Sequence, residues 1–174
     1  LANFAGSSSN ILDYLTEEVL YQQDEPPRVF LIRSSTFDEF SSPLCDFVLG
    51  IQNSQDVIER LEQSNIMIVP LDDHRRWYRY HRLFVDALRI YLRKLYLAQV
   101  PDMHRLACEW LEKQGYPELA IPHALAAGEH EKAADIVEAC ALFEISASKM
   151  ITVMHWIDRL PLDVCRKRPR LGIY

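Results

Sequence analysis

His104 and Cys108 are the two residues whose types and spacing come nearest to those of a metal site. They stand four positions apart, so both side chains would lie on one face of a helix, where zinc could reach them. A structural zinc ion needs four ligands, and two more are not found close by in the sequence. We therefore expect no metal here, with Cys108 in a helix core and His104 a surface histidine.

Residues 6–10, Gly-Ser-Ser-Ser-Asn, resemble a phosphate-binding loop in composition only, because the lysine and the preceding strand of such loops are missing. We expect a linker that leads to a helix cap at Asn10. The motifs GxxxxGK[ST], HExxH, GxSxG and GxGxxG do not occur in the sequence. We therefore expect no enzymatic activity, no catalytic residue and no cofactor bound by this chain alone.

Residues 72–94 are rich in positive charge, which could track the phosphates of DNA. Three aspartates oppose seven basic residues there: Arg75, Arg76, Arg79, Arg82, Arg89, Arg93 and Lys94. The alternative is a solvated or inter-domain face that pairs with acidic neighbours. Residues 54–64, which would be the recognition helix, carry three acidic residues against one arginine, the wrong charge for a major groove. The sequence therefore favours the alternative over direct DNA binding.

The composition is that of an ordinary globular chain without a membrane segment. Its 174 residues are 49% hydrophobic and 25% charged, with 19 basic against 25 acidic residues and a net charge of −6. That balance excludes a globally basic nucleic-acid binder. The four cysteines are far apart and form no CxxC pair, so we expect reduced core thiols and a cytoplasmic location. The chain lacks an initial methionine, and we expect it to be an internal part of a longer protein.

The apolar periodicity of the first third predicts four helices. They are expected over residues 10–22, 26–35, 43–50 and 54–64. Proline should begin the second and third helices, and a glycine should end the third. Ser54 is the expected N-cap of the fourth helix, since a serine side chain can accept from the first free backbone N–H groups.

A β-hairpin is predicted directly after these helices. Residues 66–69 form a β-branched apolar run closed by a proline, and residues 77–80 are aromatic, with a polar turn over 72–76 between them. Helices followed by such a hairpin indicate a winged-helix module over residues 26–99. Residues 1–25 would precede it as a linker or as the end of another helical region.

Residues 81–99 give the strongest helix prediction. An apolar stripe recurs there for three turns, at Leu83, Phe84, Ala87, Leu88, Tyr91, Leu92 and Leu95. The stripe is wide enough to contact both the wing and later helices, so this helix could act as a stiff lever. Residues 100–174 then read as short Ala-rich helices with glycines at the turns, typical of TPR-like stacked helical hairpins at the start of an α-solenoid. The fold class is therefore mainly α.

The longest distinctive motifs match a known family in their order along the chain. They are Phe-Leu-Ile-Arg-Ser-Ser and Pro-Leu-Cys-Asp at residues 30–35 and 43–46, residues 66–73 and Trp-Tyr-Arg-Tyr-His at 77–81, His-Ala-Leu-Ala-Ala-Gly at 123–128, and residues 133–135, 156–161 and 168–171. This pattern resembles the MalT class of large ATP-dependent LuxR-type transcription regulators, which belong to the STAND NTPases.

The resemblance implies a position within a longer protein. An NTPase that binds ATP or ADP would precede this segment, and a helical-repeat sensor and a separate C-terminal DNA-binding domain would follow it. The segment itself would be non-catalytic and would couple nucleotide state to an inducer, whether a small molecule or a protein, without a membrane partner. The alternative is a helical-repeat scaffold that binds a partner protein.

The resemblance also implies one functional residue. In related STAND proteins a histidine of the winged helix contacts the phosphates of bound ADP, and His81 stands at the equivalent place before a long helix. An imidazole N–H beside a helix N-terminus favours a phosphate. Arg82 stands where the family has an acidic residue or a second histidine. The structural alternative for His81 is a partly buried residue that caps the helix or packs on the wing.

Overall fold

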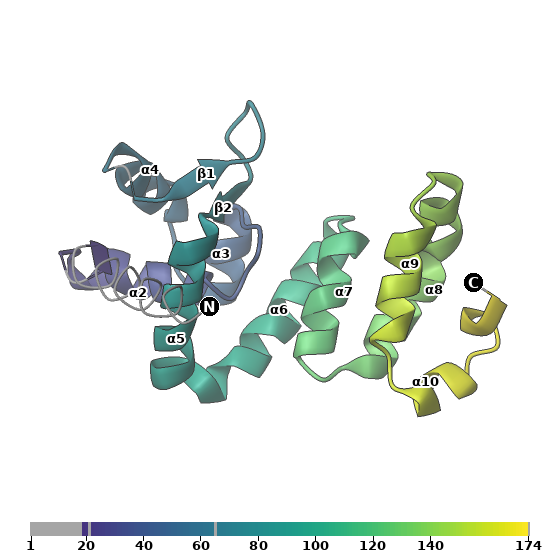
Figure 1. The fold of residues 1–174 in the computed structure, drawn as a ribbon. Helices are drawn as coiled ribbons and strands as arrows, with labels where there is room; N and C mark the ends of the chain where they lie inside the picture. Colours follow the sequence, from purple (N-terminus) through teal and green to yellow (C-terminus); the bar gives the residue numbers. More distant parts are fainter. Residues whose placement is uncertain (1–18, 21, 65, 174) are drawn as a thin grey trace, which may run out of the picture. The chain divides into compact units, whose positions relative to one another are not determined.

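The computed structural model describes residues 19–20, 22–64 and 66–173. They divide into two compact units, one up to Val100 and one from Pro101 onward. Figure 1 shows the helices and strands of both units. Every helix of the described chain is too short or too polar to cross a lipid bilayer. The helix predicted over residues 10–22 falls almost wholly outside the described residues.

Three short helices open the first unit: α2 (Glu25–Ser34), α3 (Ser42–Leu49) and α4 (Ser54–Gln63). Their bounds confirm the three helices predicted after residue 25 to within a residue or so. Helix α2 has proline in its first turn, where the missing N–H costs no helical hydrogen bond. Gly50 ends α3 in the left-handed region, with a φ of 67° that a residue without Cβ adopts readily.

The prediction that Ser54 caps α4 is wrong. Asn53 is the N-cap, in the left-handed region, and Ser54 is the first helical residue. The Ser54 hydroxyl and the Ser54 N–H both donate to the Asp46 carboxylate of α3. Ser54 is fully buried, so this contact fixes the junction of α3 with α4 instead of satisfying the helix end.

The predicted wing is present as an antiparallel hairpin of β1 (Ile68–Pro70) and β2 (Tyr78–Tyr80). Both strands are shorter than the sequence predicted. Tyr78 pairs with Pro70 across the hairpin and also with Phe40 on its other side, where two backbone hydrogen bonds of 2.8 Å form. The loop before α3 therefore adds a third, one-residue strand to the wing.

Helix α5 (Arg82–Tyr96) follows the wing and continues into a 3₁₀ turn, η2 (Leu97–Gln99). It packs against α2. Its buried residues are Phe84, Ala87, Leu88 and Leu92. The predicted stripe is wider than the face that this unit buries, because Leu83 and Leu95 are 42% and 56% exposed.

The second unit is helical throughout the part described. Its elements are α6 (Val100–Lys113), α7 (Pro117–Ala126), α8 (His130–Ser146), α9 (Met150–Asp158), α10 (Leu162–Arg166) and the 3₁₀ turn η3 (Leu171–Ile173). Gly115 and Gly128 adopt positive φ between α6, α7 and α8, as the sequence predicted for the turns.

Alanines let the helices of this unit approach closely. Helix α8 packs on both α7 and α9, and its fully buried residues include Ala133, Ala134 and Ala141. The winged helix followed by helical hairpins confirms the predicted mainly-α fold class. On α9, Val153 and Trp156 are buried, whereas Ile151 is 84% exposed.

Candidate functional site

His81 lies at the junction of the wing with α5. Its N–H donates to the Met67 carbonyl over 2.8 Å, and its own carbonyl accepts from Phe84 and Val85 at 3.0 Å, the first bonds of the helix. The backbone of His81 is therefore the N-cap of α5, with φ of −60° and ψ of 139°. The wing and the helix together hold this residue in one conformation.

Two packed aromatic residues, Tyr80 and Phe84, flank His81 in the sequence. Tyr80 is buried, and its ring lies 4.8 Å from that of Phe40 and 5.8 Å, edge to face, from that of Phe84. The Tyr80 hydroxyl is 2.6 Å from the hydroxyl of Ser34. The alternation of a strand turns the neighbour of a buried tyrosine outward, so local structure places His81 at the surface.

The imidazole of His81 is exposed and makes no capping hydrogen bond with the described chain. His81 therefore caps α5 through its backbone, as the structural alternative expected, but it is exposed where that alternative expected partial burial. Arg82, the first residue of α5, is exposed as well, and the first turn of this fully described helix contains no acidic residue. A helix N-terminus, an imidazole and a guanidinium together form a surface that suits an anion such as a phosphate.

The positive charge of residues 72–94 is partly neutralised by acidic residues of the same unit. Arg75 pairs with Glu62 of α4 at 3.1 Å, and Arg76 lies 3.9 Å from Asp72. Arg89 of α5 pairs with Asp38 at 2.5 Å and donates to the Ser35 carbonyl at 2.9 Å. Three of the seven basic residues therefore pair with acidic neighbours.

Asp72 organises the loop of the wing. Its carboxylate accepts from the backbone N–H groups of His74, Arg76 and Trp77, the last at 2.7 Å. Desolvation alone would raise the pKa of this carboxyl, but the hydrogen bonds from Trp77, Arg76 and His74 and the charge of Arg76 lower it overall. The loop therefore has a defined shape, with Arg75 at a positive φ of 52°.

The two residues of the possible metal spacing, His104 and Cys108, both lie on α6. His104 is half-buried, and its Nδ1 lies 2.7 Å from Nδ1 of His123 on α7, so the expectation of a surface histidine is wrong. Cys108 is buried, as expected, and burial raises the pKa of its thiol to about 11. Among the described residues, no three His, Cys, Asp or Glu side chains gather as metal ligands would. The serine-rich residues 6–10 lie outside the described part of the chain.

The four cysteines are free thiols, and Cys45, Cys108 and Cys140 are buried as the sequence predicted. Burial raises the pKa of Cys45 well above its ordinary value and that of Cys140 to about 11. Both thiols therefore stay protonated and unreactive near neutral pH. Cys165 is only half-buried.

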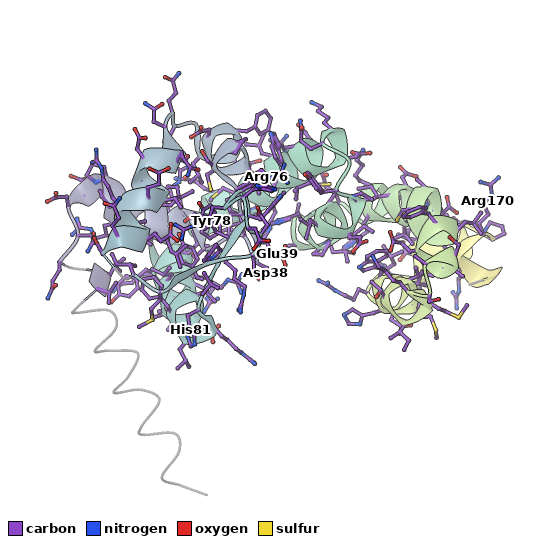
Figure 2. All side chains as sticks on the ribbon, turned by 90° about the horizontal axis from the view of Figure 1, so that it is seen from above. Asp38, Glu39, Arg76, Tyr78, His81 and Arg170 are labelled. Atoms are coloured by element: carbon purple, nitrogen blue, oxygen red, sulfur yellow. The ribbon has the colours of Figure 1, made fainter. Side chains whose placement is uncertain are left out.

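In Figure 2, His81 lies at the edge of its unit, apart from Arg76 of the wing loop. The surface formed by His81 and Arg82 is therefore separate from the wing loop. Sequence reasoning found His81 through the resemblance. It missed the contact of His104 with His123 because 19 residues separate the two histidines and no local pattern joins them.

Comparison with known proteins gives consistent matches. A family model described as the MalT winged helix domain matches residues 16–100. The chain is 31% identical, over 99% of its length, to serine/threonine-protein kinase PknK of Mycobacterium tuberculosis, of which it covers 16%. It is 34% identical, over 97% of its length, to the HTH-type transcriptional regulator MalT of Klebsiella pneumoniae subsp. pneumoniae, of which it covers 19%. The chain thus spans less than a fifth of each relative.

Proposed function

Residues 16–100 match the family model of the MalT winged helix domain, and we propose that this chain is the coupling segment of a nucleotide-regulated transcription activator. It is a non-catalytic regulatory region of a MalT-type protein. In the proposed protein a STAND-type NTPase precedes it, and a helical-repeat sensor and a separate C-terminal DNA-binding domain follow it. The protein works in the cytoplasm, responds to a small-molecule or protein inducer and needs no membrane.

The observation that carries this proposal is that two relatives of different kinds share this segment. One is called a serine/threonine-protein kinase and the other an HTH-type transcriptional regulator, yet each matches nearly the whole chain. A segment shared by a protein kinase and a transcription regulator supports a role that is common to both proteins. That role is regulation, and it is neither the kinase reaction nor DNA binding. The ion pairs of Arg75 in the wing loop and of Arg89 on α5 support the same view, since direct DNA contact needs basic side chains that face the phosphates.

In the proposed mechanism, His81 and Arg82 bind the phosphates of ADP held by the upstream NTPase. The imidazole N–H and the guanidinium donate to phosphate oxygens, and the N-terminus of α5 adds its positive end. This contact stabilises the resting state. Loss of the contact, when ATP replaces ADP or inducer binds, frees the winged helix to change its interface, which couples the two ligands reciprocally.

The test uses the whole protein that contains this segment. His81→Ala should weaken ADP binding about tenfold, as expected for loss of a charge-assisted hydrogen bond, and should raise basal transcription activity. ADP affinity is measured by calorimetry and activity by a reporter promoter. His155→Ala, at an exposed histidine of α9, is the matched control and should change neither quantity. Unchanged ADP affinity and basal activity in His81→Ala would contradict the nucleotide contact.

A second candidate function is a helical-repeat scaffold for a partner protein. It is favoured by the apolar residues that α8 and α9 leave at the surface, among which Phe143 is 72% and Ile151 84% exposed. Under this alternative, Phe143→Ser with Ile151→Ser abolishes function while every His81 variant behaves as wild type. Under the coupling proposal, the His81 variant alone already changes nucleotide response.

A further inference from the structure

A polar cavity of about 620 Å³ lies between α4 and the wing, apart from His81. One wall comes from α4, with Glu59, Glu62 and two flanking glutamines, and the other wall comes from the wing loop, with His74 and Arg75. Tyr78 of β2 contributes the remaining lining. We call this space the α4–wing cavity.

The hydroxyl of Tyr78 has an unmet hydrogen-bonding requirement. Tyr78 is fully buried, and its hydroxyl finds no hydrogen-bond partner among the residues that the structure describes. Its backbone is held by Phe40 through two hydrogen bonds, and its ring stacks on that of Phe40 at 6.0 Å, so the side chain has little freedom to seek a partner elsewhere. A buried hydroxyl without a partner is costly, which points to an atom supplied by a ligand.

The α4 wall of the cavity already binds one guanidinium. Nη1 of Arg75 lies 3.1 Å from both carboxylate oxygens of Glu62. The Glu62 side chain is 21% exposed, whereas that of Arg75 is 64% exposed and extends from a residue in the left-handed region. The Glu62 carboxylate is thus the more buried member of this pair, and the Arg75 guanidinium faces the solvent.

The cavity also has acceptors beyond those that Arg75 uses. Glu59 is exposed and its carboxylate accepts from Gln55 at 2.9 Å, which leaves further lone pairs for a donor. Two carboxylates therefore stand against one guanidinium in the lining. An anion such as a nucleic-acid phosphate would meet Glu59 and Glu62 at close range, so the charge of the cavity selects a cation.

We propose that the α4–wing cavity binds an arginine or lysine side chain from a basic segment of a partner protein. The incoming cation donates to Glu59 and Glu62 and to the hydroxyl oxygen of Tyr78, and it competes with Arg75 for Glu62. This inference does not rest on the proposed function, since it involves neither His81 nor nucleotide.

The experiment titrates the full chain at low salt with a blocked peptide of alternating arginine and glycine, followed by NMR of the backbone amides. Glu59→Gln and Glu62→Gln should each weaken binding about tenfold, and Tyr78→Phe about threefold. Glu39→Gln removes an exposed carboxylate of the same unit outside the cavity and should leave affinity at the wild-type value. Equal losses in Glu39→Gln would overturn the proposal, because attraction would then be non-specific.

A gain-of-binding variant tests the competition. Arg75→Ala vacates Glu62 and should tighten peptide binding severalfold, more than Arg79→Ala, which removes an exposed arginine outside the cavity lining. Equal changes in the two arginine variants would overturn the competition with Arg75. A peptide with glutamate in place of arginine should not bind, and the proposal fails if it binds as well as the basic peptide.

The thermal stability of Tyr78→Phe is the folding control. Since the hydroxyl has no partner in the described chain, its removal should leave the melting temperature unchanged or higher while peptide binding falls. A clear loss of stability would show that the hydroxyl already has an intramolecular partner, and the proposal would lose the observation that distinguishes this cavity from a surface acidic cluster.

Discussion

The hydroxyl oxygens of Ser34 and Tyr80 lie 2.6 Å apart and join the end of α2 to the second strand of the wing across 46 residues of sequence. The Ser34 hydroxyl also lies 2.6 Å from the Phe30 carbonyl, to which it donates, so Tyr80 is the donor in the shared contact. Burial raises the pKa of Tyr80 far above its ordinary value, which keeps that proton in place. The contact holds the residue next to His81 in the core.

Tyr80→Phe should lower the free energy of unfolding by about 1 kcal/mol, because Ser34 keeps its carbonyl acceptor but loses the phenolic donor. Urea denaturation with a tryptophan fluorescence signal measures the difference. Tyr78→Phe is the matched control on the same strand and should show no loss, since that hydroxyl has no partner in the described chain. Equal destabilisation by the two variants would contradict this assignment.

Phe84→Ala should cost about 3–5 kcal/mol, because Phe84 is 1% exposed and its ring meets that of Tyr80 edge to face. Leu83→Ala is the control at the neighbouring position, where the side chain is 42% exposed, and should cost far less. Denaturant midpoints of the two variants give the comparison. A melting temperature unchanged by Phe84→Ala would contradict the packing of this side chain in the core of its unit.

Asp72→Asn should destabilise the wing in a pH-dependent way. The pKa of Asp72 is lower in the folded chain than its ordinary value near 3.9, so the folded state binds fewer protons and the carboxylate stabilises it above about pH 4. That contribution is lost as the pH falls through the lowered pKa. The melting temperatures of wild type and variant should therefore differ at pH 6 and converge near pH 2.

Asp73→Asn is the control for this experiment, as the adjacent exposed aspartate of the same loop. Its melting temperature should follow that of the wild type at every pH. A difference between wild type and Asp72→Asn that persists unchanged at the lowest pH would show that charge on the carboxylate does not stabilise the loop.

Arg168→Met should weaken the second unit by about 1 kcal/mol at low salt. The Arg168 guanidinium lies 2.8 Å from Glu131, 2.6 Å from Asp135 and 3.2 Å from Glu138, three carboxylates along one face of α8. The hydrogen bonds with Glu131 and Asp135 raise its pKa, so it is charged throughout the accessible range. Without it, the three acidic residues repel one another.

The salt dependence of the destabilisation shows whether this repulsion causes it, because added ions screen the repulsion between exposed carboxylates. The difference in melting temperature between wild type and Arg168→Met should shrink when the salt concentration rises from about 0.05 M to 1 M. Arg170→Met, at an exposed arginine two residues further along, serves as the control (Figure 2). A difference independent of salt would point to packing of the arginine stem instead.

The order of helices and strands can be predicted from the sequence, because it depends on local properties. A repeat of apolar residues at helical spacing, a proline in the first turn of α2 and a glycine after α3 each act within a few residues. A β-branched apolar run and an aromatic run on either side of a polar turn likewise identified the wing before α5. The motif match that pointed to His81 is also a property of contiguous residues.

Partners that are distant in sequence were decided only by the tertiary structure. Ser54 is a good N-cap by type, but Asp46 eight residues earlier takes its hydroxyl, since a charged acceptor in a buried junction binds more strongly than a helix end exposed to water. His104 and His123 meet because two helices bring them together. The unmet hydroxyl of Tyr78 depends in the same way on what the fold places around it.

Periodicity shows which residues share a helix face, but how much of that face is covered depends on how many neighbours pack against it. Leu83 and Phe84 belong to the same apolar stripe and are adjacent in the sequence, yet one is exposed and the other is buried against Tyr80. Burial is a property of three-dimensional packing, and the number and position of neighbours are absent from any local pattern. The sequence thus determined the elements and their order, and the tertiary structure decided which of their side chains meet.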